Sequence, residues 1–385
     1  MAVVGRTPFP QHPHRYPIVR QVPGSSDPNP ASLKISTTSG LMTGIVKPAA
    51  PNVRAFLSIP YAQPPVGELR WRSPQPLTDA MQVSRDVSRY GPSCQQFPDA
   101  RQAGLFDIPN AFTVVQTTNS GDITGREGEG TFDEDCLTLS VHTPNQVSSA
   151  DPLPVLIFIS GGGMVTGGIN VPVQDPSQMI QRSQSHIVVA MNYRVGIFGF
   201  PAAEGISNMT ENNLGILDQR MAIEWARDNV AAFGGDPSRM VLWGQSAGAF
   251  SVGAHEFAFA DDPIVSGFIA DSGNLFSPFG VAALDTTNFT YVANMLCQQS
   301  EGVRDPAEEL NCLRQVPGMN IQKFINDRTP KDGTAAEVKF GPSVDGKLLF
   351  APPMYEKLSG MGVGSNVVSI LLHKNMIAMR LTRYF

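Results

Sequence analysis

The sequence has no long apolar run, no basic stripe and no cluster of metal ligands, and each absence excludes a class of protein. Its strand-like apolar runs stay below about ten residues, whereas a helix that spans a membrane needs about 20. The net charge of −6 argues against nucleic acid as the main partner. No group of histidines and cysteines has the spacing of a metal site, so the sequence implies no metal and no cofactor.

Cysteine and tryptophan are scarce, with four and three residues in a chain of 385. Four cysteines are compatible with two disulfides or with four buried thiols. The hydrophobic content of 42% is nevertheless ordinary for a globular protein. The length and composition therefore allow a large core, in one α/β domain or in two smaller ones.

The first thirty residues differ from the rest of the chain. Residues 1–30 carry seven prolines and little apolar periodicity, so we predict a disordered arm whose His12 and His14 are solvated rather than bound to a metal. From residue 31 the pattern becomes globular, without an internal repeat or a convincing linker. The sequence therefore predicts one domain over residues 31–366, followed by a divergent tail over residues 367–385.

One stretch has the layout of a nucleophile elbow. The apolar run Met240–Trp243 leads into Gly244-Gln245-Ser246-Ala247-Gly248, and a helical pattern follows over Ala249–Phe259. A strand, a tight turn with flanking glycines and a helix are what a G-x-S-x-G nucleophile requires, because the bend exposes the serine in a strained turn. An ordinary turn is the alternative, since glycine, serine and alanine are common.

A second glycine-rich stretch follows the apolar strand Val155–Ile159. Gly161-Gly162-Gly163 would leave backbone N–H groups unshielded, as in an oxyanion hole, although a flexible turn fits equally well. Further strands are predicted at 186–192 and Gly267–Ala270, with a helix from Leu217 between them. Strands that alternate with helices favour an α/β fold with a mostly parallel, doubly wound sheet.

The chain as a whole resembles the type-B carboxylesterase family, which includes cholinesterases, fungal secreted lipases and the non-enzymatic neuroligins, and it is most similar to fungal members. The ordered motifs that carry the resemblance run from about residue 33 to 357. They are Ile59-Pro-Tyr-Ala-Gln-Pro-Pro-Val-Gly67, Glu134-Asp-Cys-Leu137, Gly161-Gly-Gly163, Asn192-Tyr-Arg-Val-Gly196, Asn213-Leu-Gly-Ile-Leu-Asp-Gln219, Phe233-Gly-Gly-Asp-Pro237, Gly244-Gln-Ser-Ala-Gly248 and Gly341-Pro-Ser-Val-Asp-Gly346.

The resemblance implies an α/β-hydrolase fold with Ser246 as the acylated nucleophile. The backbone N–H groups of Gly162, Gly163 and Ala247 match the family's oxyanion donors, and Ser160 stands where many members carry histidine or an aromatic residue. The reaction implied is hydrolysis of a carboxylic ester, with a small-molecule or lipid ester as substrate. A non-catalytic binding protein of the same fold is the first alternative, and an unstable truncated product is the second.

The resemblance also implies two disulfides and an ion pair. Cys94 with Cys136, and Cys297 with Cys312, match the family's disulfide loops. Arg70 with Glu134 matches an ion pair that ties the early segment to the first loop, although a surface role is possible.

Cholinesterases hold a quaternary ammonium on a tryptophan of the first disulfide loop. The loop 94–136 contains none, so a choline ester is not expected as substrate. Its phenylalanines suit an apolar group of the ester; they are Phe97, Phe106, Phe112 and Phe132.

The acid and the base of a Ser-acid-His triad have no counterpart at matching positions. No aspartate or glutamate follows Glu356, and only His255 and His373 follow Ser246. We therefore expect a poor esterase that lacks the closing C-terminal strands and helices of the family. A shift of the reading frame beyond Leu372 would explain why the triad acid and histidine are missing. The codons of Met376 and Ile377 begin ATG-AT, and the frame set one base back reads GAT, an aspartate codon.

The signals for cellular location conflict. Two disulfides and the acceptor sequences at Asn208 and Asn288 favour a secreted glycoprotein, as the family resemblance does. The Pro-rich start, however, lacks the apolar core of a signal peptide, so either the start is misassigned or the chain stays inside the cell. The sequence does not determine the oligomeric state.

Overall fold

The computed structural model describes residues 33–78, 82–96, 132–148, 150–276, 281–297, 305–328, 338–361 and 368–372. The expectations for the arm 1–30, for Phe97, Phe106, Phe112 and His373, and for the tail beyond residue 372 concern residues outside these ranges. Those expectations stay predictions.

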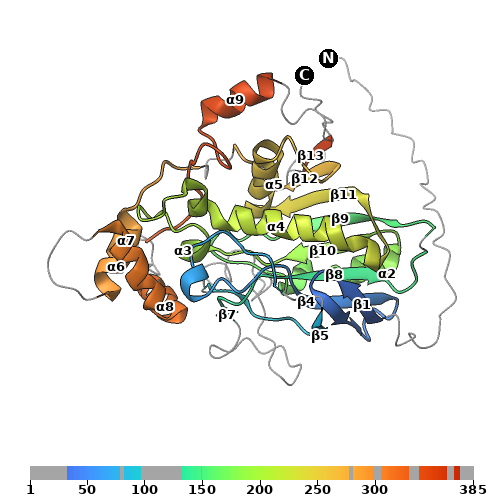
Figure 1. The fold of residues 1–385 in the computed structure, drawn as a ribbon. Coiled ribbons are helices and arrows are strands. Elements are labelled where there is room, and N and C mark those ends of the chain that lie inside the picture. Colours follow the sequence, from blue (N-terminus) through green and yellow to red (C-terminus); the bar gives the residue numbers. More distant parts are fainter. Residues whose placement is uncertain are drawn as a thin grey trace, which may run out of the picture.

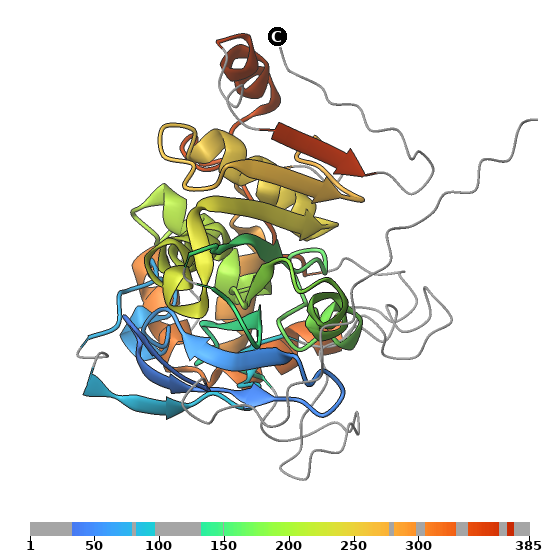
Figure 2. The same ribbon diagram turned by 90° about the vertical axis from the view of Figure 1, so that its right-hand side faces the viewer.

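An eight-stranded sheet forms the centre of the molecule, in the order β13-β12-β11-β9-β10-β8-β4-β3 (Figures 1 and 2). Strands β9 to β13 run parallel to one another, whereas β8, β4 and β3 continue the sheet by antiparallel pairing. The α/β class is confirmed, and the parallel part is the half that holds β11. The strands are β3 (Ile45–Val46), β4 (Val53–Pro60), β8 (Thr138–Pro144), β9 (Leu153–Ile159), β10 (Ile187–Met191), β11 (Gly235–Gln245), β12 (Gly267–Asp271) and β13 (Val368–Leu372).

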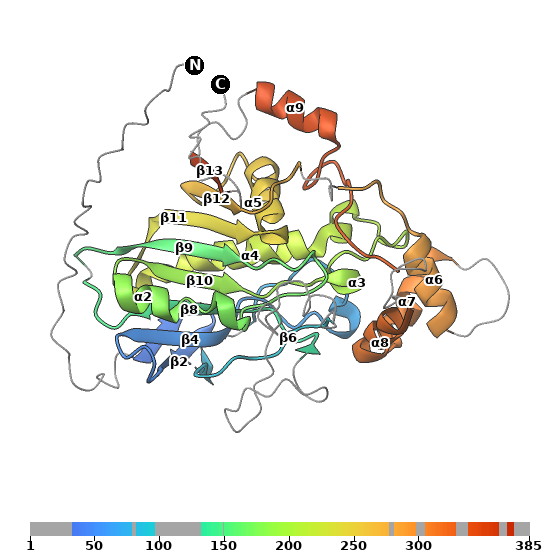
Figure 3. The same cartoon turned by 180° about the vertical axis from the view of Figure 1, so that it is seen from behind.

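Both faces of this sheet are covered, which explains why its central strands are apolar at nearly every position. Successive side chains of β9 alternate, so that Ile157 and Ile159 belong to the larger core while Phe158 belongs to a second cluster on the other face. Helices α4 (Leu214–Asn229) and α5 (Ala247–Ala258) pack on the larger core. Helix α2 (Ser177–Ser183) packs on the opposite face of the sheet, which is turned toward the viewer in Figure 3.

A group of three helices lies beside the sheet and has a core of its own (Figure 1). It consists of α6 (Thr287–Leu296), α7 (Pro306–Gln315) and α8 (Gly318–Arg328). Asp305 caps α7 by accepting from the N–H of Ala307, and Pro306 occupies the first turn, where its missing N–H costs nothing. Trp71 connects this group to the early chain, since its ring packs edge-on against Phe289 at 5.2 Å.

The remaining elements are short. Strands β1 (Lys34–Thr37), β2 (Gly40–Thr43) and β5 (Ser84–Asp86) form a small sheet, and β6 (Ser93–Cys94) pairs with β7 (Phe132–Asp133). The short helix α3 is Gly196–Gly199, α9 is Pro352–Gly360, and the 3-10 turns are η2 (Gly67–Leu69), η4 (Pro172–Gln174), η5 (Met209–Asn213) and η6 (Val230–Phe233). No helix in the described ranges combines the length and apolarity needed to cross a membrane.

Candidate active site

The register of two neighbouring strands places Ser246 beside the glycine run. Strands β9 and β11 are parallel, and their last aligned pair joins Ile159 to Gly244. The segments that follow β9 and β11 therefore leave the sheet at the same edge. The backbone of Gly161 lies against the elbow. A side chain at Gly161 would bring its Cβ within 2.6 Å of the Gln245 carbonyl and 3.0 Å from Ser246 Cβ.

Ser246 has a backbone conformation that residues other than glycine rarely adopt. Its φ is 56° and its ψ is −118°, between the end of β11 and the first residue of α5. Such conformations cost about 1 to 3 kcal/mol and persist only where the surroundings impose them. The serine side chain is exposed at the start of a 12-residue helix, whose N-terminus favours negative charge.

Regular structure on three sides imposes this conformation. The N–H of Ser246 donates to the carbonyl of Asp271 at the end of β12, at 2.9 Å. A Cβ at Gly248 would lie 2.1 Å from the carbonyl oxygen of Ile159, and one at Gly244 would lie 2.2 Å from that of Gly248. Helix α5 thus approaches β9 at a distance that only glycine permits.

The segment 160–167, here called the glycine loop, forms a closed turn beside Ser246. Gly162 has a φ of 120° and Gly163 a φ of 64°, both in the region that favours glycine. The carbonyl of Gly162 accepts from the N–H groups of Val165 and Thr166, each at 3.1 Å. The turn therefore has a defined shape.

The three expected oxyanion donors are free of internal hydrogen bonds. Within the described residues, no group accepts from the backbone N–H of Gly162, Gly163 or Ala247. Gly163 is exposed, and the other two are half-buried. Unpaired N–H groups next to an exposed serine hydroxyl are what binding of a developing oxyanion requires.

Two groups of the segment 192–196 hold the glycine loop in place, and a third holds the chain directly after it. The Tyr193 hydroxyl donates to the Ser160 carbonyl at 2.9 Å, and the Gly196 N–H donates to the Met164 carbonyl at 2.7 Å. The Asn192 Oδ1 accepts from the N–H of Ile169 at 3.0 Å. The motif Asn192–Gly196 is visible in the sequence, but its local pattern does not predict this supporting role.

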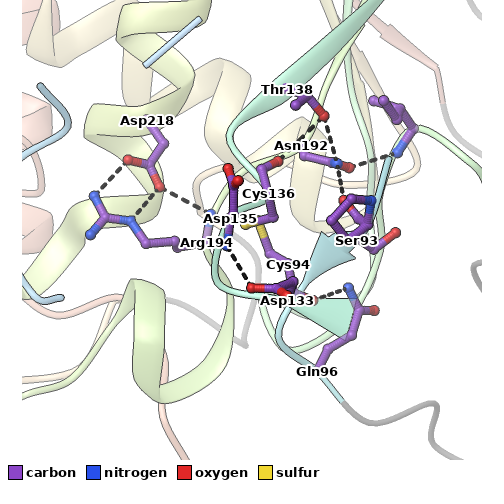
Figure 4. Close-up of a disulfide and its surroundings, with 12 residues drawn as sticks. Ser93, Cys94, Gln96, Asp133, Asp135, Cys136, Thr138, Asn192, Arg194 and Asp218 are labelled. Atoms are coloured by element: carbon purple, nitrogen blue, oxygen red, sulfur yellow. Dashed lines mark hydrogen bonds and ion pairs between the residues drawn. A yellow bond between two sulfur atoms is a disulfide. The ribbon is translucent and has the colours of Figure 1, made fainter. Parts of the chain in front are cut away.

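A buried ion pair fixes the same segment to α4, as the left of Figure 4 shows. Arg194 donates from Nε and Nη2 to the two carboxylate oxygens of Asp218, at 2.8 and 2.7 Å, and its own N–H donates to Oδ2 at 3.0 Å. Asp218 is fully buried. Because an unpaired buried charge is costly, removing either partner would destabilise the segment that supports the glycine loop.

The predicted pair of Arg70 and Glu134 is present and buried. Two guanidinium nitrogens of Arg70 contact the two carboxylate oxygens of Glu134, and the side chains are only 6% and 13% exposed. A surface role is therefore wrong. The third nitrogen, Nη1, donates to the carbonyls of Leu313 and Val316 at the end of α7, so the pair also anchors the three-helix group.

Both predicted disulfides are formed. Cys94 bonds to Cys136, and Cys297 bonds to Cys312, so the alternative of buried thiols is wrong. The first joins β6 to the chain that enters β8, directly beside the polar network of Asn192 and Thr138 (Figure 4). The second closes the connection between α6 and α7.

His255 lies far along α5 and is closed off from Ser246. It is 3% exposed, and its Nε2 lies 3.2 Å from Gln219 Oε1 of α4. Burial, with a smaller contribution from the nearby charge of Arg220, lowers the pKa of His255 to about 3. The imidazole is therefore neutral, and its Nε2 is already paired with Gln219. The described residues contain no other histidine that follows Ser246.

The two glycosylation acceptors differ in accessibility. Asn208 is exposed and caps η5, where its Oδ1 accepts from the Thr210 hydroxyl at 2.8 Å. Asn288 is half-buried, and its Nδ2 donates to the carbonyl of Lys339 at 2.9 Å. Among the described residues, no three acidic, histidine or cysteine side chains are grouped as metal ligands would be.

Comparisons with known proteins identify the family of this chain. A model of the carboxylesterase family matches residues 31–371. The chain is 41% identical over 339 residues to chlorogenic acid esterase of Aspergillus niger, covering 86% of this chain and 60% of that protein. It is 39% identical to secreted lipase 5 of Gibberella zeae, in a match that covers 79% of this chain and 57% of that lipase. It is 34% identical to cholinesterase of Mus musculus, in a match that covers 83% of this chain and 49% of that cholinesterase. The chain thus spans about three fifths of the length of the two fungal relatives.

Proposed function

This chain belongs to the carboxylesterase family, and on that premise we propose that the protein hydrolyses uncharged carboxylic esters through an acyl-enzyme on Ser246. The observation that carries the proposal is the strained, exposed serine beside three unpaired backbone N–H groups. A binding protein would need neither the strain nor the free donors.

In the proposed reaction, Ser246 Oγ attacks the ester carbonyl carbon, and a base takes the hydroxyl proton. The carbonyl oxygen becomes an oxyanion, to which Gly162, Gly163 and Ala247 donate. Collapse of this intermediate breaks the bond to the alcohol oxygen, which receives the proton, and water then hydrolyses the acyl-serine by the same steps. His255, the described histidine that follows Ser246, does not supply the base, because it is buried and its Nε2 contacts Gln219 Oε1.

The relatives' names support an ester substrate without defining it. They name an esterase of chlorogenic acid, a lipase and a cholinesterase. A choline ester is disfavoured, because loop 94–136 has no tryptophan to receive a quaternary ammonium. An aryl or alkyl ester is the substrate class we propose.

We further propose that the protein is secreted and glycosylated. Two disulfides require an oxidising compartment, and one relative is named a secreted lipase. The exposed Asn208 is the better acceptor of the two. Glycosidase treatment of protein from the culture medium should increase gel mobility, and an Asn208→Gln variant should lose most of this shift.

The transcript is first sequenced through codons 357–385 to its stop codon. The protein that it encodes is then produced and tested for ester hydrolysis. A p-nitrophenyl ester should be hydrolysed, and Ser246→Ala should lower kcat by about a million-fold. A wild-type rate no higher than that of Ser246→Ala would overturn the proposal.

A further inference from the structure

The carboxamide of Gln96 pairs with both backbone groups of one residue in the glycine loop. Its Oε1 accepts from the N–H of Gly167, and its Nε2 donates to the carbonyl of Gly167, each at 2.8 Å. The same nitrogen donates to the Cys94 carbonyl at 2.9 Å. Gln96 is 2% exposed, so these bonds are shielded from water and costly to lose.

Gly167 is the residue at which the glycine loop closes. Its φ is 117°, and a Cβ there would lie 2.4 Å from the carbonyl oxygen of Gly161. A Cβ at Gly162 would likewise lie 2.3 Å from the Thr166 carbonyl. The backbones at the two ends of the loop, 161–162 and 166–167, are thus in direct contact, so a shift of Gly167 would displace Gly162 and Gly163.

The Cys94–Cys136 disulfide sets the position of Gln96. Gln96 follows Cys94 by two residues and bonds back to its carbonyl, and the disulfide joins Cys94 to the start of β8 (Figure 4). Ser93 adds a parallel connection, since its hydroxyl donates to Asn170 Oδ1 at 2.7 Å. The β6 segment therefore contacts the chain after the glycine run at two points.

We propose that Gln96 is a positioning residue, which through Gly167 fixes the glycine loop so that the N–H groups of Gly162 and Gly163 face the ester oxygen. This inference rests on the ester hydrolysis proposed above. Gln96 itself touches no reacting atom. Its role is to hold the donors at the distance that oxyanion binding requires.

The test compares Gln96→Met with Gln95→Met in the protein encoded by the transcript. Methionine keeps the volume of glutamine but loses the hydrogen bonds. Gln95 is a matched control, because it is the neighbouring residue, is 3% exposed, and contacts Met319 of α8 rather than the glycine loop. Amide hydrogen exchange of a peptide covering residues 160–168 reports on the loop whether or not the protein has activity.

Gln96→Met should speed exchange in this peptide by about tenfold or more, which corresponds to about 1.4 kcal/mol of lost protection. It should lower kcat by about ten- to a hundred-fold with KM within about twofold, since the donors act mainly on the transition state. Gln95→Met should change neither. Gln96→Glu, whose buried carboxylate would face the carbonyls of Gly167 and Cys94, should speed exchange at least as much as Gln96→Met.

Three results would overturn the inference, and they separate it from the function it rests on. Unchanged exchange in Gln96→Met would show that Gln96 does not fix the loop. Faster exchange with a kcat equal to that of Gln95→Met would show that the loop is fixed for another purpose. If the wild type were no faster than Ser246→Ala, the catalytic role would fail with the proposed function, while exchange would still decide whether Gln96 holds the loop.

Discussion

The turn around Ser246, here called the elbow, and the glycine loop lie side by side at the ends of β11 and β9, but different kinds of contact hold them. The elbow joins a central strand to a helix, and backbone packing against β9 and β12 imposes the unusual dihedral angles of Ser246. No helix follows the glycine loop directly. Side chains and backbone groups from distant segments hold it, among them Gln96, Tyr193 and Gly196.

This difference predicts how each part fails. A side chain that is too large in the elbow collides with the central sheet, so the free energy of unfolding of the whole domain falls. A disturbed glycine loop can shift without separating any strands, so the reaction suffers before the fold does. The four predictions below test this comparison, beginning with the largest expected effect.

Gly248→Ala should lower the free energy of unfolding by about 3 kcal/mol or more, because its Cβ would lie 2.1 Å from the carbonyl oxygen of Ile159. Urea denaturation measures the loss. Gly341→Ala is the control, since a Cβ there meets nothing within 4 Å and should change stability by less than about 0.5 kcal/mol. Equal midpoints for the two variants would contradict the close approach of α5 to β9.

Gly167→Ala should lower kcat about a hundred-fold, or about 2.7 kcal/mol in the barrier, because the new Cβ would displace the loop that carries Gly162 and Gly163. Its loss of stability should be clearly smaller than that of Gly248→Ala. Steady-state kinetics and urea denaturation of the same preparation measure both. If the two variants lost stability equally, the contrast between elbow and loop would be wrong.

Acid should lower the free energy of unfolding through His255, which lies on α5, the helix that follows the elbow. Its pKa is about 3 in the fold, against about 6.5 when unfolded, so the unfolded chain binds the extra proton first. Stability is therefore full above about pH 6.5 and falls as the pH drops toward 3, by about 2 kcal/mol at pH 5 for this one group. Urea denaturation at pH 7 and pH 5 should show that His255→Gln loses less than the wild type between these values. An equal loss would exclude His255 as the cause.

Ser246→Gly should raise the free energy of unfolding by about 1 kcal/mol relative to Ser246→Ala, because only glycine relieves the strain at a φ of 56°. Both variants lack the hydroxyl, so their difference isolates the backbone. Thermal melting under identical conditions measures it. A Ser246→Gly variant no more stable than Ser246→Ala would mean that the elbow is not strained.

The sequence predicted the elbow more completely than its surroundings. The run Met240–Trp243, the flanking glycines and the following helical pattern are local signals, and they placed Ser246 between a strand and a helix. The boundaries were less accurate, since α5 begins at Ala247 rather than Ala249, and α4 begins at Leu214 rather than Leu217. Fraying and capping decide such ends, and hydrophobic periodicity does not encode them.

The parallel sheet was predicted only in part. Alternation of strands and helices indicated the half from β9 to β12, where a helix can connect parallel neighbours. Strands β3, β4 and β8 pair antiparallel, and their apolar pattern is the same as that of buried parallel strands. The direction of pairing depends on how the chain crosses between strands, which composition does not reveal.

By itself the sequence determined the α/β class and the two glycine-rich turns, one of them around Ser246, because periodicity and the positions of glycines are local signals. Tertiary structure alone decided that Gln96 pairs with Gly167, that Arg194 pairs with Asp218 and that His255 is closed off. These contacts join residues 71, 24 and 36 positions apart. Only the packed sheet brings such distant polar groups together, and burial makes each of them depend on its partner.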